Sequence, residues 1–362
     1  MRVALVTPEW PGCGSSHGVG AYVAVLARAL RGAGCTVLTL VVDDSGRWLI
    51  DEAGVRRAGA QGGPAALRPL LAHGWLRSEL ASFAPEVVEC SNWGGLGGGL
   101  AGPWRRAVRL STPVSAIAPP DLWRRLARGL HRHAEQATVG QAHLVIADSA
   151  AMAALCHTAY GRGADAVIPH AWDGPQQEPD PGARDVLFVG RLEPRKGIAT
   201  LLQAWARIRQ AHPQRVLHLV GADQHGHGAA CLAEHGGGGV VVHGPVAENA
   251  LAGIRRLCLV QAVPSRFESF GMVVLEAWAA GLAVVATAGG ALAEVVGTGG
   301  TVVPVGDAPA LAAALHANLS DAGLRADAVA QGRKLLAGRF SPRQLAAQTL
   351  AAYGRPTATG GP

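Results

Sequence analysis

The sequence predicts an α/β protein made of two Rossmann-like, doubly wound domains that face each other across a cleft. The first observation is the length, because 362 residues suit two domains that each bury a core of their own. The second is the alternation of short apolar runs with amphipathic stretches, which is typical of a parallel sheet covered by helices on both faces. The third is a single break in this alternation, after which the same pattern starts again.

The first domain is expected to span residues 1–170. Its strands are predicted where the chain is apolar on both faces, at residues 3–6, 37–42, 87–90, 107–110, 144–147 and 166–168. Its helices are predicted where apolar residues recur at i, i+3 and i+4, at residues 21–30, 65–82, 122–137 and 150–160. The first strand leads directly into Thr7-Pro8, so the N-terminus has no signal-peptide pattern.

A linker is expected at residues 171–184, where prolines, acids and glycines crowd together and can bury nothing. The second domain is expected at residues 185–340, with strands at 186–189, 216–220, 240–242, 259–263 and 283–286 and helices at 198–210, 248–256 and 271–280. Residues 341–362 are predicted to be a C-terminal helix and tail that packs back on the first domain, since a helical period runs from 309 to 353.

The composition argues against a disulfide-bonded, a zinc-binding, a membrane-spanning and a nucleic-acid-binding protein. The six cysteines lie far apart without a C-x-x-C pair, which argues against disulfides and a zinc site and favours a cytoplasmic protein. The longest apolar stretches are interrupted well before the roughly 18 residues that a membrane-spanning helix needs. The net charge of +6 attracts anions, but only 5% of the residues are aromatic, so nucleic acid is not expected as a partner.

Basic residues concentrate in segments 104–109 and 123–133. The second segment places Trp123, Leu126 and Leu130 on one helical stripe with arginines beside it, the pattern of a helix that lies on a membrane surface. A helix that covers a sheet shows the same stripe. Both interpretations stay open, and a soluble acceptor is preferred over membrane contact.

Three loops follow predicted strands and carry residues that suit a phosphorylated ligand. A glycine-rich loop that includes Gly18 opens the first helix, where backbone N–H groups attract phosphate. Gly190, Arg191 and Lys196 follow the first strand of the second domain, at the edge where open α/β sheets bind ligands. The third loop and its helix, residues 264–281, contain Glu268 and Glu276, whose carboxylates suit vicinal hydroxyls.

Taken together, these motifs resemble the retaining nucleotide-sugar glycosyltransferases of family four, which have the GT-B fold. The resemblance rests on Gly190-Arg191-x4-Lys196-Gly197, Glu268-x7-Glu276 with Phe270-Gly271, Gly289-Gly290 to Glu294, and Gly306-Asp307. It implies that Arg191, Lys196 and Glu268 carry catalysis, the two cations by stabilising the leaving diphosphate and Glu268 by contacting the sugar. It also implies donor contacts from Gly18, Gly190, His243, Gly244, Pro245, Val246, Phe270, Gly271, Met272, Val273 and Glu276, the last of them with the ribose hydroxyls.

The same resemblance implies a retaining hexosyltransferase that uses a UDP-sugar as substrate and needs neither a metal nor a cofactor. Many members carry a histidine where this chain reads Ser111-Thr112, so those two residues join Asn92 and Trp93 as candidates for contact with the acceptor. Aromatic rings and an amide suit a small polyhydroxylated or aminated molecule, as in natural-product (antibiotic) biosynthesis. A membrane-associated glycolipid or polysaccharide glycosyltransferase and a nucleotide-sugar epimerase of the same fold remain the alternatives.

Overall fold

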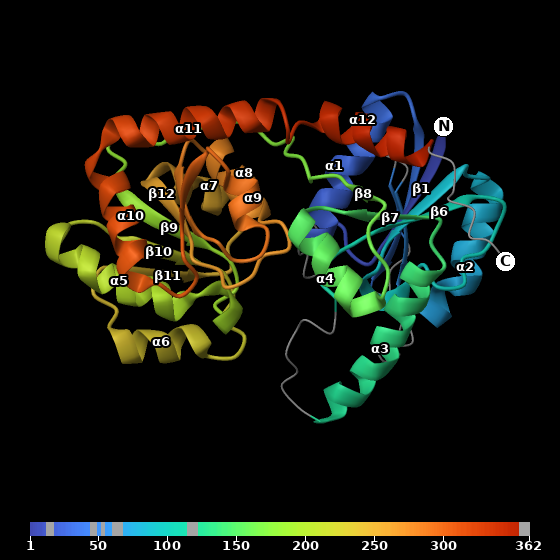
Figure 1. The fold of residues 1–362 in the computed structure, drawn as a ribbon, viewed down its shortest axis with the longest axis horizontal. Coiled ribbons are helices and arrows are strands. Elements are labelled where there is room, and N and C mark those ends of the chain that lie inside the picture. Colours follow the sequence, from blue (N-terminus) through green and yellow to red (C-terminus); the bar gives the residue numbers. More distant parts are fainter. Residues whose placement is uncertain (12–17, 44–48, 52–54, 60–67, 114–121, 355–362) are drawn as a thin grey trace. The chain divides into compact units, whose positions relative to one another are not determined.

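The computed structural model describes residues 1–11, 18–43, 49–51, 55–59, 68–113 and 122–354. The chain forms two compact units (Figure 1), of which unit 1 comprises Met1–Ala171 and Pro342–Pro362 and unit 2 comprises Trp172–Ser341. Each unit has one sheet with helices on its faces. The doubly wound α/β class predicted from the sequence is therefore confirmed for both halves.

The sheet of unit 1 has the strand order β3-β4-β2-β1-β5-β6-β7-β8, and every neighbouring pair is parallel except β3 with β4. Its strands are β1 (Arg2–Thr7), β2 (Thr36–Asp43), β3 (Leu49–Asp51), β4 (Val55–Gly59), β5 (Val87–Ser91), β6 (Arg105–Arg109), β7 (Leu144–Ala147) and β8 (Ala166–Val167). β1 lies at the centre, where Val3 pairs with both Val37 and Val87. β3 and β4 were not predicted from the sequence, because β3 has only three residues and β4 includes Arg56 and Arg57.

Five α-helices cover this sheet in the described part of unit 1: α1 (Gly18–Gly32), α2 (Arg68–Phe83), α3 (Leu122–Gly140), α4 (Ala150–Tyr160) and α12 (Pro342–Tyr353). The last of them comes from the end of the chain and packs beside α1 (Figure 1). Leu345 and Tyr353 of α12 join Val3 and Leu26 in one buried apolar cluster. Unit 1 is therefore completed by residues that follow unit 2 in the sequence.

The sheet of unit 2 is entirely parallel, with the order β11-β10-β9-β12-β13-β14. Its strands are β9 (Asp185–Val189), β10 (Leu217–Val220), β11 (Val240–Gly244), β12 (Cys258–Val263), β13 (Ala283–Thr287) and β14 (Gly300–Val303). Counted along the chain, this is the order 3-2-1-4-5-6 of a dinucleotide-binding sheet. Strand order reverses between β9 and β12, so the loops after these two strands flank the point where such sheets bind ligands.

The helices of unit 2 are α5 (Ile198–Ala211), α6 (His227–His235), α7 (Glu248–Arg256), α8 (Met272–Ala279), α9 (Leu292–Val296), α10 (Ala308–Ser320) and α11 (Ala322–Ala337). The segment from 309 to 353, predicted to be helical from its period, is helical and is divided into three helices, α10, α11 and α12. Asp307 caps α10 by accepting from the Ala310 N–H at 2.8 Å, and Asp321 caps α11 through the Leu324 N–H at 3.0 Å. Side-chain capping of this kind starts a new helix within a continuous apolar period.

Candidate functional site

Two loops of unit 2 meet at the carboxyl ends of β9 and β12. Gly197 has a φ of +72°, and a Cβ there would lie 2.0 Å from the carbonyl oxygen of Pro264. The Arg266 N–H also donates to the Arg195 carbonyl oxygen at 2.8 Å. Because only glycine permits this approach, Gly197 allows the loop after β9 to lie against the loop after β12.

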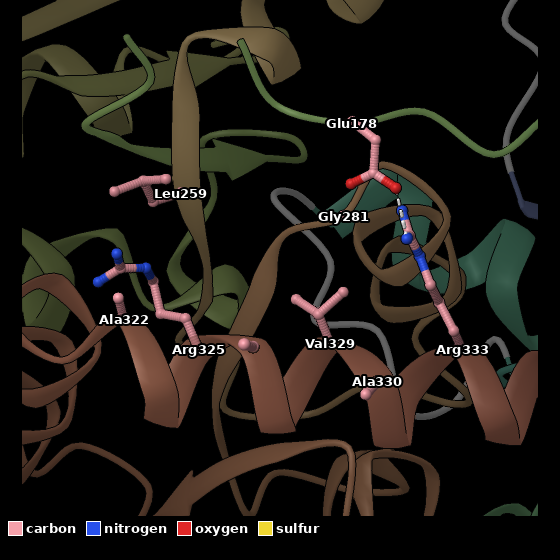
Figure 2. Close-up of a pocket in the computed structure, with 9 residues that line it drawn as sticks. Glu178, Leu259, Gly281, Ala322, Arg325, Val329, Ala330 and Arg333 are labelled. Atoms are coloured by element: carbon pink, nitrogen blue, oxygen red, sulfur yellow. Dashed lines mark hydrogen bonds and ion pairs between the residues drawn. The ribbon is translucent and has the colours of Figure 1, made fainter. Parts of the chain in front are cut away.

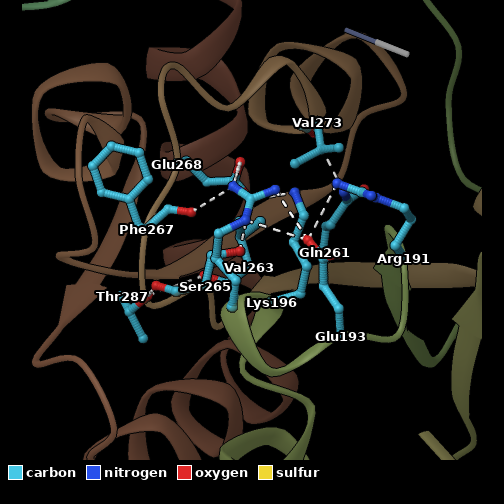
Figure 3. Close-up of polar contacts among 11 residues, drawn as sticks. Arg191, Glu193, Lys196, Gln261, Val263, Ser265, Phe267, Glu268, Val273 and Thr287 are labelled. Atoms are coloured by element: carbon cyan, nitrogen blue, oxygen red, sulfur yellow. Dashed lines mark hydrogen bonds and ion pairs between the residues drawn. The ribbon is translucent and has the colours of Figure 1, made fainter. Parts of the chain in front are cut away.

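The centre of the site is an ion pair between these loops (Figure 3). Lys196 Nζ lies 2.6 Å from Glu268 Oε1, which also accepts from Ser265 Oγ at 2.7 Å. The side chains of Lys196 and Glu268 are only 15% and 9% exposed. Burial alone would raise the pKa of Glu268, but Lys196, Ser265 and Arg195 together hold that pKa below its ordinary value. Glu268 is therefore a carboxylate near neutral pH.

The two oxygens of Glu268 differ in their surroundings. Oε1 accepts both hydrogen bonds, whereas Oε2 has only a loose ion pair with Arg195 Nη1 at 3.9 Å among the residues that the structure describes. Gly289 and Gly290 hold the backbone at Glu268, since the Glu268 N–H donates to the Gly289 carbonyl oxygen and a Cβ at Gly290 would lie 2.2 Å from the Glu268 carbonyl oxygen. Oε2 is thus the oxygen that remains available to a ligand hydroxyl.

Arg191 and Arg195 complete a cluster of cations at the end of β9. Both guanidinium groups contact Glu193 Oε1, at 3.3 Å from Arg191 Nη2 and 3.0 Å from Arg195 Nη2. Arg195 also donates to the Phe267 carbonyl oxygen at 3.0 Å, while the Arg191 side chain is 40% exposed. Sequence reasoning singled out Arg191 and Lys196 but missed Arg195, for which the adjacent Arg-Lys pair was the available signal.

The helix α8 begins at this site. Gly271 precedes it with a φ of +97°, and Met272 and Val273 form its first turn, where backbone N–H groups have no partner within the helix. Val273 also accepts from Gln261 Nε2 through its carbonyl oxygen at 3.3 Å. Phe270 is buried with its ring 5.8 Å from that of Phe340, so the Phe270 side chain belongs to the core.

Glu276 of α8 is paired with a residue that the sequence analysis did not single out. Its Oε2 lies 2.6 Å from Arg255 Nη2 of α7, and Arg255 Nη1 lies 2.7 Å from Glu248. Burial raises the pKa of Glu276, which the charge of Arg255 partly offsets. No sequence motif links α7 to α8, so this pair was visible only in the structure.

The residues expected beside the nucleotide base lie at the end of β11. His243 Nε2 is 2.9 Å from His218 Nδ1, and His218 Nε2 is 3.3 Å from Asp185 Oδ2. Burial and the neighbouring His218 lower the pKa of His243. Gly244 ends the strand with a φ of +67°, and its carbonyl oxygen accepts from the Gly221 N–H at 2.9 Å. Pro245 is exposed, and Val246 is half-buried.

In unit 1, three of the acceptor candidates are hydrogen-bonded near the ends of β5 and β6. The fully buried Asn92 accepts from the Ser111 N–H at 2.6 Å and donates to Tyr160 Oη at 2.9 Å. Trp93 donates its N–H to Ser91 Oγ at 3.1 Å, and Thr112 is half-buried. The side-chain amide of Asn92 therefore forms its hydrogen bonds within unit 1.

Gly18, the donor candidate of unit 1, is the first residue of α1. The rest of its loop, residues 12–17, lies outside the described residues.

A pocket of about 490 Å³ lies elsewhere on unit 2 (Figure 2). Leu259 and Gly281 line it, and they lie near the amino ends of β12 and β13. Arg333 of α11 donates from Nη1 to Glu178 Oε1 at 2.5 Å and from Nη2 to the Gln177 carbonyl oxygen at 2.7 Å. This pocket therefore lies at the edge of the sheet opposite to the candidate site.

Two features are absent from the residues that the structure describes. No group of three or more His, Cys, Asp or Glu side chains within them is arranged to hold a metal ion. None of their helices combines the length and the apolar character that crossing a membrane requires.

Two family models match the chain, one in each half. The model described as "Glycosyl transferase 4-like domain" matches residues 17–171, and the model described as "Glycosyl transferases group 1" matches residues 183–321. Together they account for most of unit 1 and most of unit 2.

Known proteins match over nearly the full length. A D-inositol 3-phosphate glycosyltransferase of Xylanimonas cellulosilytica is 30% identical over 410 aligned positions, which cover 96% of this chain and 94% of that protein. The sucrose-phosphate synthase of Thermosynechococcus elongatus superposes with a TM-score of 0.80 at 25% identity, covering 97% of this chain and 98% of that one. Anabaena HepE, solved with UDP and glucose, superposes with a TM-score of 0.72 at 20% identity. The superposition covers 98% of this chain and 99% of HepE.

Other curated relatives match over a shorter region. They include further D-inositol 3-phosphate glycosyltransferases and a phosphatidyl-myo-inositol mannosyltransferase of Mycolicibacterium smegmatis, and the matched region spans less than half of their length, 39 to 45%. The full-length match and the two family models nevertheless agree with each other and with the sheet topology. The chain therefore belongs to the family-four glycosyltransferases with the GT-B fold.

Proposed function

We propose that this glycosyltransferase moves a hexose from a UDP-sugar to a small polyhydroxylated acceptor and retains the anomeric configuration. The observation that carries the proposal is the Lys196–Glu268 ion pair beside Arg191, at the switch point of the unit 2 sheet. Cations at this edge suit a diphosphate, and a buried carboxylate with one open oxygen suits a sugar hydroxyl. HepE, a structural neighbour solved with UDP and glucose, supports a uridine nucleotide.

In the proposed reaction the bond between the anomeric carbon and the diphosphate oxygen breaks, and its electron pair leaves with the diphosphate. Arg191 and Lys196 stabilise the negative charge that develops there. The acceptor oxygen bonds to the anomeric carbon from the same face, and its proton passes to the departing diphosphate. Glu268 contributes by accepting a hydrogen bond from a sugar hydroxyl at Oε2, which positions the ring.

The nucleotide is held by other parts of unit 2 in this proposal. Glu276 accepts hydrogen bonds from the ribose hydroxyls, and the backbone N–H groups at Gly271 and Met272 face the phosphates. The segment from His243 to Val246 lies beside the base, Gly190 lets the backbone approach the diphosphate, and Gly18 of unit 1 belongs to the loop expected to cover the phosphates. Phe270 contributes through its backbone, because its side chain is in the core. Val273 contributes through its backbone N–H, which lies in the first turn of α8.

For the acceptor, we propose a neutral or phosphorylated polyol contacted by Trp93, Ser111 and Thr112. Ser111 is held by Asn92, whose buried amide accepts from both its N–H and its hydroxyl. Asn92 is thus proposed to position Ser111 rather than to contact the acceptor itself. The relatives named for D-inositol 3-phosphate support a ring-shaped polyol as the acceptor class.

A glycolipid acceptor is the second candidate, favoured by one observation. Leu130 of the basic helix α3 is 63% exposed, and an apolar side chain beside arginines suits an anionic membrane surface. A relative named as a phosphatidyl-myo-inositol mannosyltransferase also supports a glycolipid acceptor. Co-sedimentation with anionic vesicles that persists at physiological salt would favour this candidate, because salt screens nonspecific attraction.

The experiment that tests the proposed function is a panel of nucleotide sugars with polyol acceptors, read out as release of free nucleoside diphosphate. We expect release to require both a UDP-sugar and an acceptor. The anomeric coupling in the NMR spectrum of the product then tests retention, and an inverted product contradicts our mechanism. Interconversion of the donor sugar without an acceptor would instead support the epimerase alternative.

A further inference from the structure

Arg255 of α7 is a buried charged residue of unit 2, and one of its two ion pairs is with Glu276, the proposed ribose carboxylate. Its side chain is 5% exposed, and its two terminal nitrogens reach different acids, Nη2 to Glu276 at 2.6 Å and Nη1 to Glu248 at 2.7 Å. Its Nε is buried and has no hydrogen-bond partner among the described residues. The guanidinium is therefore held by its two ends, between α8 and the start of α7.

Stability alone is a weak reason for this arrangement. Taking an arginine out of water is costly, and buried ion pairs contribute little more than well-packed apolar residues of similar size. Leu251 and Ile254, also on α7, are buried apolar residues, so an apolar residue at position 255 would continue the same buried surface. The feature that an apolar residue could not reproduce is the hydrogen bond to one oxygen of Glu276.

That hydrogen bond separates the roles of the two Glu276 oxygens. Oε2 is engaged by Arg255, while Oε1 has no hydrogen-bond partner in the described part of the chain. The Glu276 side chain is 22% exposed. A ligand hydroxyl that reaches Glu276 therefore meets Oε1, and an ionised carboxylate is the better acceptor for it.

The charges around Glu276 act in opposite directions. Burial raises its pKa, Arg255 lowers it, and Glu248, whose own side chain is 75% exposed, raises it. Without Arg255 the two raising effects would be unopposed, and the carboxyl would hold a proton at higher pH. Arg255 is thus the group that favours the charged form.

We propose that Arg255 is a positioning residue for the donor nucleotide, which holds Glu276 through Oε2 and so presents Oε1 to the ribose hydroxyls. This inference rests on the proposed function, in which Glu276 binds the ribose. Arg255 itself touches neither nucleotide nor sugar. Its influence is expected to pass entirely through Glu276.

The test compares Arg255→Leu with Arg256→Leu as a matched control. Both variants remove one arginine at the end of α7, but Arg256 is 59% exposed and pairs with Asp180 at 2.6 Å. For Arg255→Leu we expect the Kd for UDP and the KM for the UDP-sugar to rise about 10- to 100-fold, the worth of a charge-assisted hydrogen bond. The kcat at saturating donor stays within about 3-fold of wild type, because ribose contacts form equally in the ground and transition states.

Two further readouts separate positioning from structural support. In Arg255→Leu the donor KM should improve as the pH rises from about 6 to about 8.5, since the carboxyl regains its charge, whereas the wild-type KM should vary less. Arg255→Lys should recover part of the affinity, because its ammonium can still reach Glu276. If Arg255→Leu fails to fold, Arg255→Lys carries the test with the same pH series.

A double-mutant cycle gives the decisive outcome. If Arg255 acts through Glu276, the variant Arg255→Leu/Glu276→Gln has the KM of Glu276→Gln alone. Effects that multiply, or an Arg255→Leu variant that matches Arg256→Leu, overturn the inference while the proposed function stands. An unchanged KM in Glu276→Gln overturns the inference together with the ribose-binding role proposed for Glu276, whereas failure of the proposed function itself would appear as no release of nucleoside diphosphate from any UDP-sugar.

Discussion

Replacement of Lys196 by methionine tests the proposed catalytic site most directly. Methionine keeps most of the aliphatic side chain and removes the ammonium that lies 2.6 Å from Glu268 Oε1. If Lys196 stabilises the leaving diphosphate, its loss should resemble the loss of one oxyanion-stabilising group, about 3 to 4 kcal/mol of transition-state stabilisation. We therefore expect kcat/KM to fall by about 10²- to 10³-fold.

The same substitution changes the titration of Glu268 in a defined direction. In the wild type, burial raises the pKa of Glu268, but Lys196, Ser265 and Arg195 bring it below its ordinary value. A lowered pKa in the folded state stabilises the protein above the unfolded pKa, and this stabilisation is lost as the pH falls through the folded value. Lys196→Met removes the largest of the effects that lower the pKa of Glu268, so burial raises that pKa with less opposition. The acid limb of the pH–activity profile should therefore move to higher pH.

The assay is the release of UDP under steady-state conditions across a pH series, with circular dichroism to confirm that the variant is folded. Lys196→Arg serves as the matched variant, because it keeps the charge while changing the geometry, and it should retain more activity than Lys196→Met. The reasoning is refuted if folded Lys196→Met keeps kcat/KM within about 3-fold of wild type and an unchanged acid limb.

Three further predictions concern positions that support the two units. Tyr353→Phe removes the hydroxyl that donates to the buried carboxylate of Glu89 at 2.8 Å, so we expect unit 1 to lose about 1.5 to 3 kcal/mol, measured by urea unfolding; an unchanged midpoint contradicts this. Gly197→Ala places a Cβ 2.0 Å from the Pro264 carbonyl oxygen at a φ of +72°, which should cost at least about 1 to 2 kcal/mol and lower UDP affinity in titration calorimetry; wild-type affinity would show that the two loops need not meet. Asn92→Ala removes the amide oxygen that orders Ser111 at 2.6 Å, so we expect the acceptor KM to rise while UDP affinity stays constant, and a loss confined to UDP binding would argue against this role.

The order of strands and helices was largely predictable because it follows from periodicity. β9 and β12 are apolar runs between turn residues, and their partners in the sheet follow from the usual winding of α/β units. β3 and β4 were missed because they are short, lie at one end of the sheet and include Arg56 and Arg57. Such strands lack the apolar pattern on which the prediction depends.

The site was predictable only as separate motifs. Lys196 and Glu268 could each be named from their loops, but their hydrogen bond joins positions 72 residues apart and depends on Gly197. Arg255 gave no sequence signal, because an arginine at the end of a helix is ordinarily a solvated residue. Sequence identifies the chemistry that each loop carries, whereas the pairing of side chains is decided by which loops the sheet brings together.

Arg109 of β6 illustrates the same limit in unit 1. An arginine within a strand would be expected at the surface, yet this one is fully buried, with Nε 2.8 Å from Glu89 Oε1 and Nη2 3.2 Å from Thr349 Oγ1. Thr349 belongs to α12, 240 residues further along the chain. A buried charge of this kind can be anticipated only if its partners are known to lie nearby.

Strand order reverses between β1 and β5 in unit 1 and between β9 and β12 in unit 2. The loops at the strand ends of the two sheets carry different chemistry, and this difference supports the assignment of the donor. In unit 2 the described loops there contribute Arg191 and Lys196, two cations within reach of a ligand. In unit 1 the described residues after β5 and β6 include Asn92 and Ser111, which are neutral and hydrogen-bonded to each other. A diphosphate needs fixed positive charge when water is displaced from it, whereas a hydroxyl-bearing acceptor needs hydrogen-bonding groups held in place. The charge distribution therefore favours the donor in unit 2 and leaves the acceptor to unit 1.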